Sequence, residues 1–237
     1  MIYVTFCYKP DTDMLSMSSA RILQLDPSAR IYAVNDASNP VTKRIPGVTF
    51  LQSNFPRGGN LNGLAAVAGE LAVFEQLLQK EQAEYIVKFD CDLWPNDLEP
   101  FTDVAPGTPD YLSVERFEPF TPSGLIYRLS RHMVRELLKG YNARSEAGLW
   151  AKGAKYPEDM TIFALAQETS MRCRLIPFAS GFTAGMHDGG PGTYETLHKA
   201  GLVHCGEPLA DGSRVSREHA TLRMRLLKWE TSNRETK

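Results

Sequence analysis

The amino-acid sequence predicts an α/β fold, in which a mixed, mainly parallel sheet carries helices on both faces. Apolar, β-branched runs alternate with helical stretches in the first half of the chain, which is typical of parallel strands joined by crossover helices. Hydrophobic residues make up 43% and charged residues 23% of the 237 residues, a balance that excludes a disordered chain or a rod. No linker or internal repeat divides the chain, so we expect one domain over residues 1–237.

The first half contains four short runs with the β-branched and aromatic composition of buried strands: 2–8, 30–36, 48–51 and 85–89. Two stretches carry apolar side chains at helical spacing and are predicted helices: 11–25 and 64–82. A glycine-rich loop, RGGNLNG, lies before the second of these helices.

The second half is less regular. Its predicted strands are 110–115, 124–129 and 172–176, and 201–205 is a short strand or a turn. Its predicted helices are 130–139, which we expect to end at Gly140, 157–168 and a basic one at 215–230. We expect loops at 142–156 and, with five glycines, at 181–193.

Charge and cysteine content narrow the function classes. Lys and Arg total 26 and Asp and Glu total 28, and a net charge of −2 argues against a bulk electrostatic nucleic-acid binder. The four cysteines form no C-x-x-C pair, so a zinc ribbon or disulfide framework is not expected. We find no signal peptide and no apolar run of membrane-spanning length, and therefore expect a cytoplasmic protein.

Asp90 and Asp92 come directly after the apolar run YIVKF. The carboxyl end of a strand in an open α/β sheet is where ligands bind, and residues two apart project to the same side of an extended chain. Two converging carboxylates repel each other unless a cation lies between them, and Mg²⁺ or Mn²⁺ suits such oxygen ligands. The alternative is a surface turn or a helix cap.

The segment YIVKFDCDLWPND resembles the D-x-D region of GT-A-fold glycosyltransferases, which transfer a sugar from a nucleotide-diphosphate donor. The resemblance covers most of the chain, although its motifs are short. It implies a GT-A-like fold, a donor that is most commonly a UDP-sugar, and Mn²⁺ or Mg²⁺ at Asp90 and Asp92. It also implies that residues 1–100 bind the nucleotide and that residues 101–237 bind the acceptor and catalyse transfer.

The resemblance implies nucleotide contacts at the ends of the first two strands. Thr5, Phe6 and Tyr8 match the first position, and Asp36 matches the second, where a carboxylate often contacts base or ribose. An Asx turn is the alternative for Asp36.

The loop RGGNLNG resembles the loop that leads into the helix before the D-x-D strand. Arg57 then meets a phosphate, Asn60 and Asn62 contact base or sugar, and Asp90 contacts the donor as well as the metal. The alternative is a flexible connection with an asparagine N-cap.

Glu158 and Asp159 open a predicted helix, where the helix dipole alone favours acidic residues. The resemblance implies more, because a Glu-Asp pair stands here in many inverting members. Asp159 is then the base that removes the proton of the acceptor hydroxyl, with Glu158 in support. In a retaining enzyme the same pair would position the sugar or the acceptor instead.

His204 ends the apolar run LV, where a C-terminal histidine of the family completes the metal site with the D-x-D carboxylates. The segment HCGEP is similar to an H-x-G motif of retaining members, but the lysine that usually follows is missing. A partly buried structural histidine is the alternative.

Basic residues gather in the second half, at 128, 131, 135, 214, 217, 223, 225 and 228. Such a surface suits an anionic acceptor, nucleic acid included, and a DNA base is one acceptor that we consider. Two rival functions stay open. A sugar-phosphate nucleotidyltransferase would carry a glycine-rich loop where this chain has Lys9-Pro10-Asp11, and a non-catalytic nucleotide-binding module would need no base.

Overall fold

The computed structural model describes residues 1–53, 63–115, 121–151, 156–185, 197, 199–206 and 215–235. Its centre is a seven-stranded sheet of order β3-β2-β1-β4-β7-β6-β8. The strands are β1 (Ile2–Cys7), β2 (Arg30–Asn35), β3 (Val48–Gln52), β4 (Tyr85–Phe89), β6 (Tyr111–Glu115), β7 (Pro122–Ser130) and β8 (Cys173–Ile176). Among them only β7 runs antiparallel to its neighbours, which confirms the predicted mainly parallel sheet.

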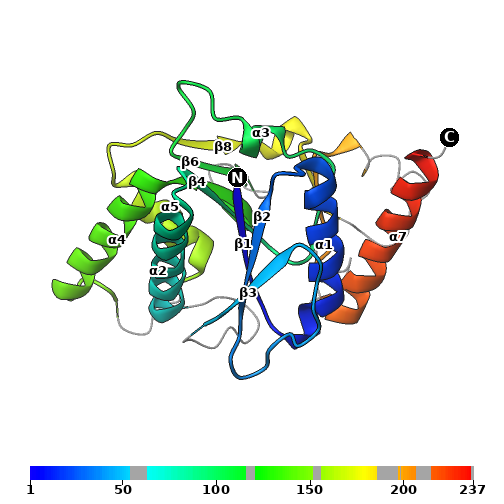
Figure 1. Ribbon diagram of the computed structural model, residues 1–237. Coiled ribbons are helices and arrows are strands. Elements are labelled where there is room, and N and C mark those ends of the chain that lie inside the picture. The colour runs from blue at the N-terminus through cyan, green and yellow to red at the C-terminus, as the bar shows by residue number, and fades with distance from the viewer. Residues whose placement is uncertain are drawn as a thin grey trace.

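Helices cover both faces of the sheet, also as predicted (Figure 1). On one face lie α1 (Thr12–Leu25) and α7 (Arg217–Glu235), and on the other lie α2 (Leu64–Glu81), α4 (Arg131–Glu146) and α5 (Glu158–Gln167). The short helices are η1 (Lys9–Asp11), α3 (Glu99–Thr102) and η2 (Phe178–Ser180).

Strand β1 shows why both faces need cover. It is buried throughout, and its side chains alternate between two apolar cores. Tyr3 and Cys7 belong to the core under α1 and α7, whereas Val4 and Phe6 belong to the core under α2, α4 and α5. A strand that is apolar on both faces is stable only between two layers of helices.

A second, three-stranded sheet has the order β5-β10-β9, from β5 (Leu93–Pro95), β10 (Leu202–His204) and β9 (Thr183–Gly185). The antiparallel register of β10 and β5 sets His204 opposite Leu93. This pairing brings a residue late in the chain to the segment that follows β4.

The prediction that a helix ends at Gly140 is wrong, and so is the predicted loop over its continuation, because α4 continues to Glu146. A Cβ at Gly140 would lie 3.7 Å from Leu165 Cδ2 of α5, so the glycine stands where the two helices pack closely. Interhelical packing here outweighs the cost of about 1 kcal/mol for glycine in a helix interior. Strands β5 and β9 and helix α3 were not predicted, because each spans only three or four residues.

Within the described residues, none of the helices combines the length and apolar character that crossing a membrane requires.

Candidate active site

The candidate site lies at the carboxyl ends of β1 and β4, the edge of the sheet where α/β proteins bind ligands. Asp90 and Asp92 follow β4, and Tyr8 follows β1. The two aspartates face different partners, so the site has two parts.

We call the first part the Asp92 cluster: Tyr8, Asp11, Asp92, His204 and Arg217. Asp92 Oδ2 lies 3.6 Å from His204 Nε2 and 3.5 Å from Arg217 Nη1. These three side chains come from the segment after β4, from β10 and from the first residue of α7. The fold therefore assembles an acid, an imidazole and a guanidinium from parts of the chain that are distant in sequence.

Arg217 lies between two carboxylates. Its Nε is 3.4 Å from Asp11 Oδ1 and donates to the Tyr8 hydroxyl at 3.4 Å, and its guanidinium lies 5.7 Å from the centroid of the Tyr8 ring. Burial alone would lower the pKa of Arg217, but Asp11 and Asp92 outweigh it, so the net pKa is raised. The arginine is thus a permanent positive charge in this cluster.

Asp92 and His204 fit a divalent cation as donors. A Cβ at Gly206 would lie 2.1 Å from Asp92 Oδ2 and 3.1 Å from His204 Nε2, so only glycine lets these groups share the space. A carboxylate oxygen with an imidazole nitrogen suits Mn²⁺. Within the described ranges, however, no group of three or more His, Cys, Asp or Glu residues is arranged to hold a metal ion.

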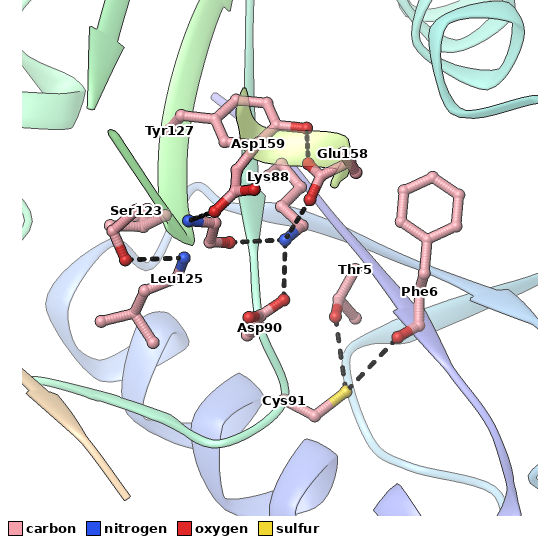
Figure 2. A network of polar contacts seen from close by, with 12 residues as sticks. Thr5, Phe6, Lys88, Asp90, Cys91, Ser123, Leu125, Tyr127, Glu158 and Asp159 are labelled. Carbon is pink, nitrogen blue, oxygen red and sulfur yellow. Dashed lines mark hydrogen bonds and ion pairs between the residues drawn. The ribbon is translucent and has the colours of Figure 1, made fainter. Parts of the chain in front are cut away.

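Asp90 is not part of that cluster. Its Oδ1 accepts a hydrogen bond from Lys88 Nζ at 2.7 Å, and the same ammonium donates to the Gly124 carbonyl at 2.5 Å (Figure 2). Lys88 lies on the same strand two residues earlier, and its side chain is 2% exposed. The expected metal ligand Asp90 is therefore paired with a buried lysine in this structure.

We call the second part the buried acidic network. It consists of the buried Glu70, Lys88, Tyr127 and Glu158 together with Asp90, whose side chain is 29% exposed. Glu158 Oε2 lies 3.8 Å from Lys88 Nζ. The Tyr127 hydroxyl lies 2.5 Å from Glu158 Oε1 and 2.5 Å from Glu70 Oε1. The network thus connects α2, β4, β7 and the first turn of α5.

A single proton explains how Tyr127 serves two carboxyl groups. A phenol has one hydrogen to donate, so one of the two carboxyls must be protonated and donate to it. Burial and the neighbouring Glu158 carboxylate raise the pKa of Glu70 well above its ordinary value. Burial also raises the pKa of Glu158, against the opposing effect of Lys88. Glu70 is fully buried, whereas Glu158 has the Lys88 ammonium 3.8 Å away to stabilise its negative charge, so we place the proton on Glu70.

Asp159 is buried beside this network, and its Oδ2 accepts a hydrogen bond from the Gly124 amide at 3.0 Å. The backbone of Gly124 therefore contacts Asp159 through its N–H and Lys88 through its carbonyl. A Cβ at Gly124 would lie 3.3 Å from both Asp159 Cβ and Oδ2, which is close for any larger residue. The expected base is thus held in one orientation by the start of β7.

Of the expected nucleotide contacts at the end of β1, two are buried in the fold and one lies in the Asp92 cluster. Thr5 is fully buried, and its hydroxyl lies 3.4 Å from Cys91 Sγ. Phe6 is also buried and packs edge-on against Phe74 at a centroid distance of 6.2 Å. Tyr8 reaches the Asp92 cluster.

Asp36 accepts hydrogen bonds from the amide and the hydroxyl of Ser38, at 2.8 and 2.6 Å, which is the Asx turn that the sequence left as an alternative. The expected phosphate and sugar contacts Arg57, Asn60 and Asn62 lie outside the described residues.

The basic residues of the second half do not form one surface. Arg128 is buried and donates to the carbonyls of Phe101 and Asp103, at 3.0 and 2.6 Å. Arg223 is buried as well and donates to the Cys205 carbonyl at 2.9 Å. Both charges stabilise loops of the fold and are removed from any acceptor-binding surface.

Sequence reasoning did not single out Lys88 or Glu70. The signal for Lys88 was present: it is the one charged residue in the apolar run YIVKF. A lysine is almost never fully buried unless it is paired, so its position two residues before Asp90 indicated a carboxylate partner. Glu70 had no such signal, because helix α2 carries other acidic residues.

Neither a family model nor a curated protein matches this sequence. Solved structures do match. The chain is similar to a glycosyltransferase involved in the glycosylation of the major capsid of PBCV-1, with a TM-score of 0.59 and 12% identity over 95% of this chain and 98% of that one. It is also similar to the galactosyltransferase LgtC in complex with donor and acceptor sugar analogues, with a TM-score of 0.51 and 13% identity over 96% of each chain. At these identities the likeness is one of architecture, and the chain has the GT-A-like fold of these glycosyltransferases.

Proposed function

We propose that this protein is a glycosyltransferase that moves a sugar from a nucleotide-diphosphate donor, a UDP-sugar in the first instance, to an acceptor hydroxyl. One observation carries the proposal: Asp92 of the D-x-D segment and His204 of β10 meet at 3.6 Å at the carboxyl edge of a GT-A-like sheet. The solved structure of LgtC with donor and acceptor sugar analogues supports sugar transfer as the reaction class for this fold.

Asp92 and His204 are the residues that would hold Mn²⁺ or Mg²⁺, with Asp90 as the further ligand that the resemblance implies. When bound, the cation would stabilise the negative charge that develops on the leaving nucleoside diphosphate. Arg217 adds a positive charge of the protein itself beside Asp92, since its guanidinium is 3.5 Å from that carboxylate. The diphosphate of a donor would find complementary charge there.

Asp159 is the proposed base. Its carboxylate would take the proton of the acceptor hydroxyl as the hydroxyl oxygen forms its bond to the anomeric carbon. The bond between that carbon and the diphosphate oxygen breaks, and the electron pair leaves with the nucleoside diphosphate. Attack opposite the leaving group inverts the configuration. The Gly124 amide, 3.0 Å from Asp159 Oδ2, orients the carboxylate for this task.

The test is calorimetry and thermal shift with a panel of nucleoside diphosphates and their sugars, each with Mn²⁺, Mg²⁺ or EDTA. A ligand that binds only the native state raises its melting temperature. We expect one nucleotide to stabilise the protein only when metal is present. Product analysis with the same nucleotide sugar would then show a released nucleoside diphosphate.

Two variants make the test specific. Asp92→Asn should abolish the metal-dependent stabilisation, because the carboxylate charge is lost. Asp103→Asn is the matched control, since that exposed aspartate caps a turn at Ala105 and touches neither part of the site. Binding that survives Asp92→Asn would indicate a non-catalytic nucleotide-binding module. Release of pyrophosphate from a nucleoside triphosphate mixed with a sugar phosphate, with no nucleoside diphosphate released from the nucleotide sugar, would indicate a nucleotidyltransferase.

A further inference from the structure

We infer that Lys88 is a positioning residue that joins the two acidic motifs of the site, orienting Asp90 at the end of β4 together with the Asp159 carboxylate at the start of α5. The inference rests on the proposed function for its catalytic meaning, but its geometry stands alone. An ammonium group has three N–H donors. In this structure the Lys88 ammonium donates to Asp90 Oδ1 and to the Gly124 carbonyl and forms an ion pair with Glu158 at 3.8 Å. These partners come from the segment after β4, from β7 and from α5.

Because Lys88 is buried, its ammonium needs hydrogen-bond partners and counter-charges from the protein itself. Its side chain is 2% exposed, so water cannot replace a lost partner. A buried charge is stable only when it is paired and hydrogen-bonded. The carboxylates of Asp90 and Glu158, at 2.7 and 3.8 Å, supply the counter-charges. Burial would lower the pKa of Lys88, but these carboxylates outweigh it and the net pKa is raised, so the side chain is a cation.

The path from Lys88 to Asp159 runs through one residue, Gly124, and the two peptide groups that meet at its Cα. Lys88 Nζ donates to the Gly124 carbonyl at 2.5 Å, and the Gly124 amide donates to Asp159 Oδ2 at 3.0 Å (Figure 2). A shift of the Gly124 backbone would therefore move Asp159 as well. The same ammonium holds Asp90 Oδ1, so one cation fixes the relative placement of the donor side and the acceptor side of the site.

Glu70 and Tyr127 complete the far end of this network. The Tyr127 hydroxyl bridges Glu158 to the fully buried Glu70, at 2.5 Å from each. Glu70 Oε2 has no hydrogen-bond partner within the part of the chain that the structure describes. A neutral carboxylic acid at Glu70 tolerates this position, and it leaves Glu158 and Asp90 as the carboxylates that Lys88 balances.

The first experiment needs no ligand. Amide hydrogen exchange, read by NMR or by mass spectrometry of peptides that contain residues 122–130, reports on the Gly124 amide. Lys88→Met keeps the length of the side chain and removes its charge. We expect it to accelerate exchange of the Gly124 amide by about tenfold or more, the ratio that corresponds to one lost hydrogen bond with a charged group.

Arg128→Met is the matched control. Arg128 is another buried cation, on β7, but its partners are the backbone carbonyls of Phe101 and Asp103. Acceleration at Gly124 in Lys88→Met but not in Arg128→Met supports the inference. Unchanged exchange in Lys88→Met, or the same acceleration in both variants, overturns it. If Lys88→Met does not fold, the double variant Lys88→Met with Glu158→Gln removes one charge of each sign, and the same readout and the same criteria apply to it.

The second experiment tests the catalytic meaning. UDP affinity with Mn²⁺ is measured by calorimetry for wild type, Lys88→Met, Asp90→Asn and the double variant that combines Lys88→Met with Asp90→Asn. We expect Lys88→Met to weaken binding about tenfold in wild type and to have no further effect in Asp90→Asn, as for a residue that acts through another. Additive effects overturn the role through Asp90. If wild type binds no nucleotide under any condition, the proposed glycosyltransferase function fails, while the exchange experiment still decides whether Lys88 positions the two motifs.

Discussion

Asp90 and Asp92 differ by two positions in the sequence and stand in different surroundings. Asp90 is paired at 2.7 Å with Lys88, a buried cation that also contacts Gly124 and lies 3.8 Å from Glu158. Asp92 lies at 3.5–3.6 Å from Arg217 and His204, both of them partly exposed. The first carboxylate is anchored from inside the fold, whereas the partners of the second face solvent.

This difference suggests that the buried acidic network and the Asp92 cluster have different roles. Electrostatic interactions in a buried, low-dielectric region are strong and orient groups permanently, but an unpaired group there is costly. Pairs in contact with water are weaker and can exchange partners. We therefore expect the buried acidic network to set geometry, and the Asp92 cluster to exchange protein partners for ligand. Four predictions follow the comparison from its largest expected effect to its smallest.

The largest effect is expected at Asp159, on the buried side. Asp159→Asn keeps the shape and the hydrogen bond from Gly124 but removes the base. Turnover should fall by about 10²–10⁴-fold, the usual contribution of general base catalysis, while donor affinity stays the same. Steady-state kinetics with calorimetry of donor binding checks this. Loss of donor affinity with unchanged turnover would reverse the roles of the two parts of the site.

Gly206→Ala addresses the other side. The new Cβ would stand 2.1 Å from Asp92 Oδ2, so the carboxylate must move away from His204. We expect metal-dependent nucleotide affinity to fall by about 10–100-fold, as when the support of a metal ligand is lost. Gly124→Ala is the comparison variant, because its Cβ is 3.3 Å from Asp159 and should affect turnover more than affinity. Unchanged affinity in Gly206→Ala would exclude Asp92 and His204 as a joint cation site.

The sequence predicted the sheet better than the site. Alternating apolar runs are a local property, and they located β1, β2, β3 and β4 within one or two residues. The pairing of Asp92 with His204 came from family resemblance, since β5 spans only three residues and no local pattern shows that it pairs with β10.

The partner of Asp90 was missed for a different reason. Whether Lys88 extends to solvent or turns inward depends on β7 and α5 covering it, and neither contact can be deduced from the strand itself. Similarly, Gly140 signalled a helix end by propensity, but packing against Leu165 decided otherwise. Secondary structure can be predicted from short sequence patterns, whereas the electrostatics of the site depends on which helices and strands pack against each other in the fold.

Glu70→Gln tests the protonation state of the buried network. Burial, and then the Glu158 carboxylate, raise the pKa of Glu70 well above 4.5. A carboxyl whose pKa is raised by folding binds more protons in the native state, so the wild type loses stability as pH rises from about 4.5 through the raised pKa, by at most about 1.4 kcal/mol per pH unit. Glutamine does not titrate, so the free energy of unfolding of Glu70→Gln relative to wild type should increase over that window.

Urea unfolding at several pH values between 5 and 8 measures this difference, and this range lies above the ordinary glutamate pKa of 4.5. Glu168→Gln is the control, because Glu168 is half exposed and pairs with Arg144 at the surface. The pH dependence of Glu70→Gln is read relative to that of this variant. A difference for Glu70→Gln that does not change with pH would mean that Glu70 is ionised in the native protein, and that the proton bridging it to Tyr127 is assigned to the wrong group.

The smallest effect is expected at Arg225, on the same helix as Arg217. Arg225 Nη2 lies 2.7 Å from Asp13 Oδ2, closer than any contact of Arg217 with a carboxylate, yet both side chains of the pair are about half exposed. Arg225→Met should cost only about 0.2–1 kcal/mol of unfolding free energy, and high salt should reduce that cost. Urea unfolding in low and high salt, in a cycle with Asp13→Asn, measures the pair alone. This exposed pair could instead contribute as much unfolding free energy as a buried ion pair. Burial would then not explain the difference between the two parts of the site, and the distance between the charges would have to explain it.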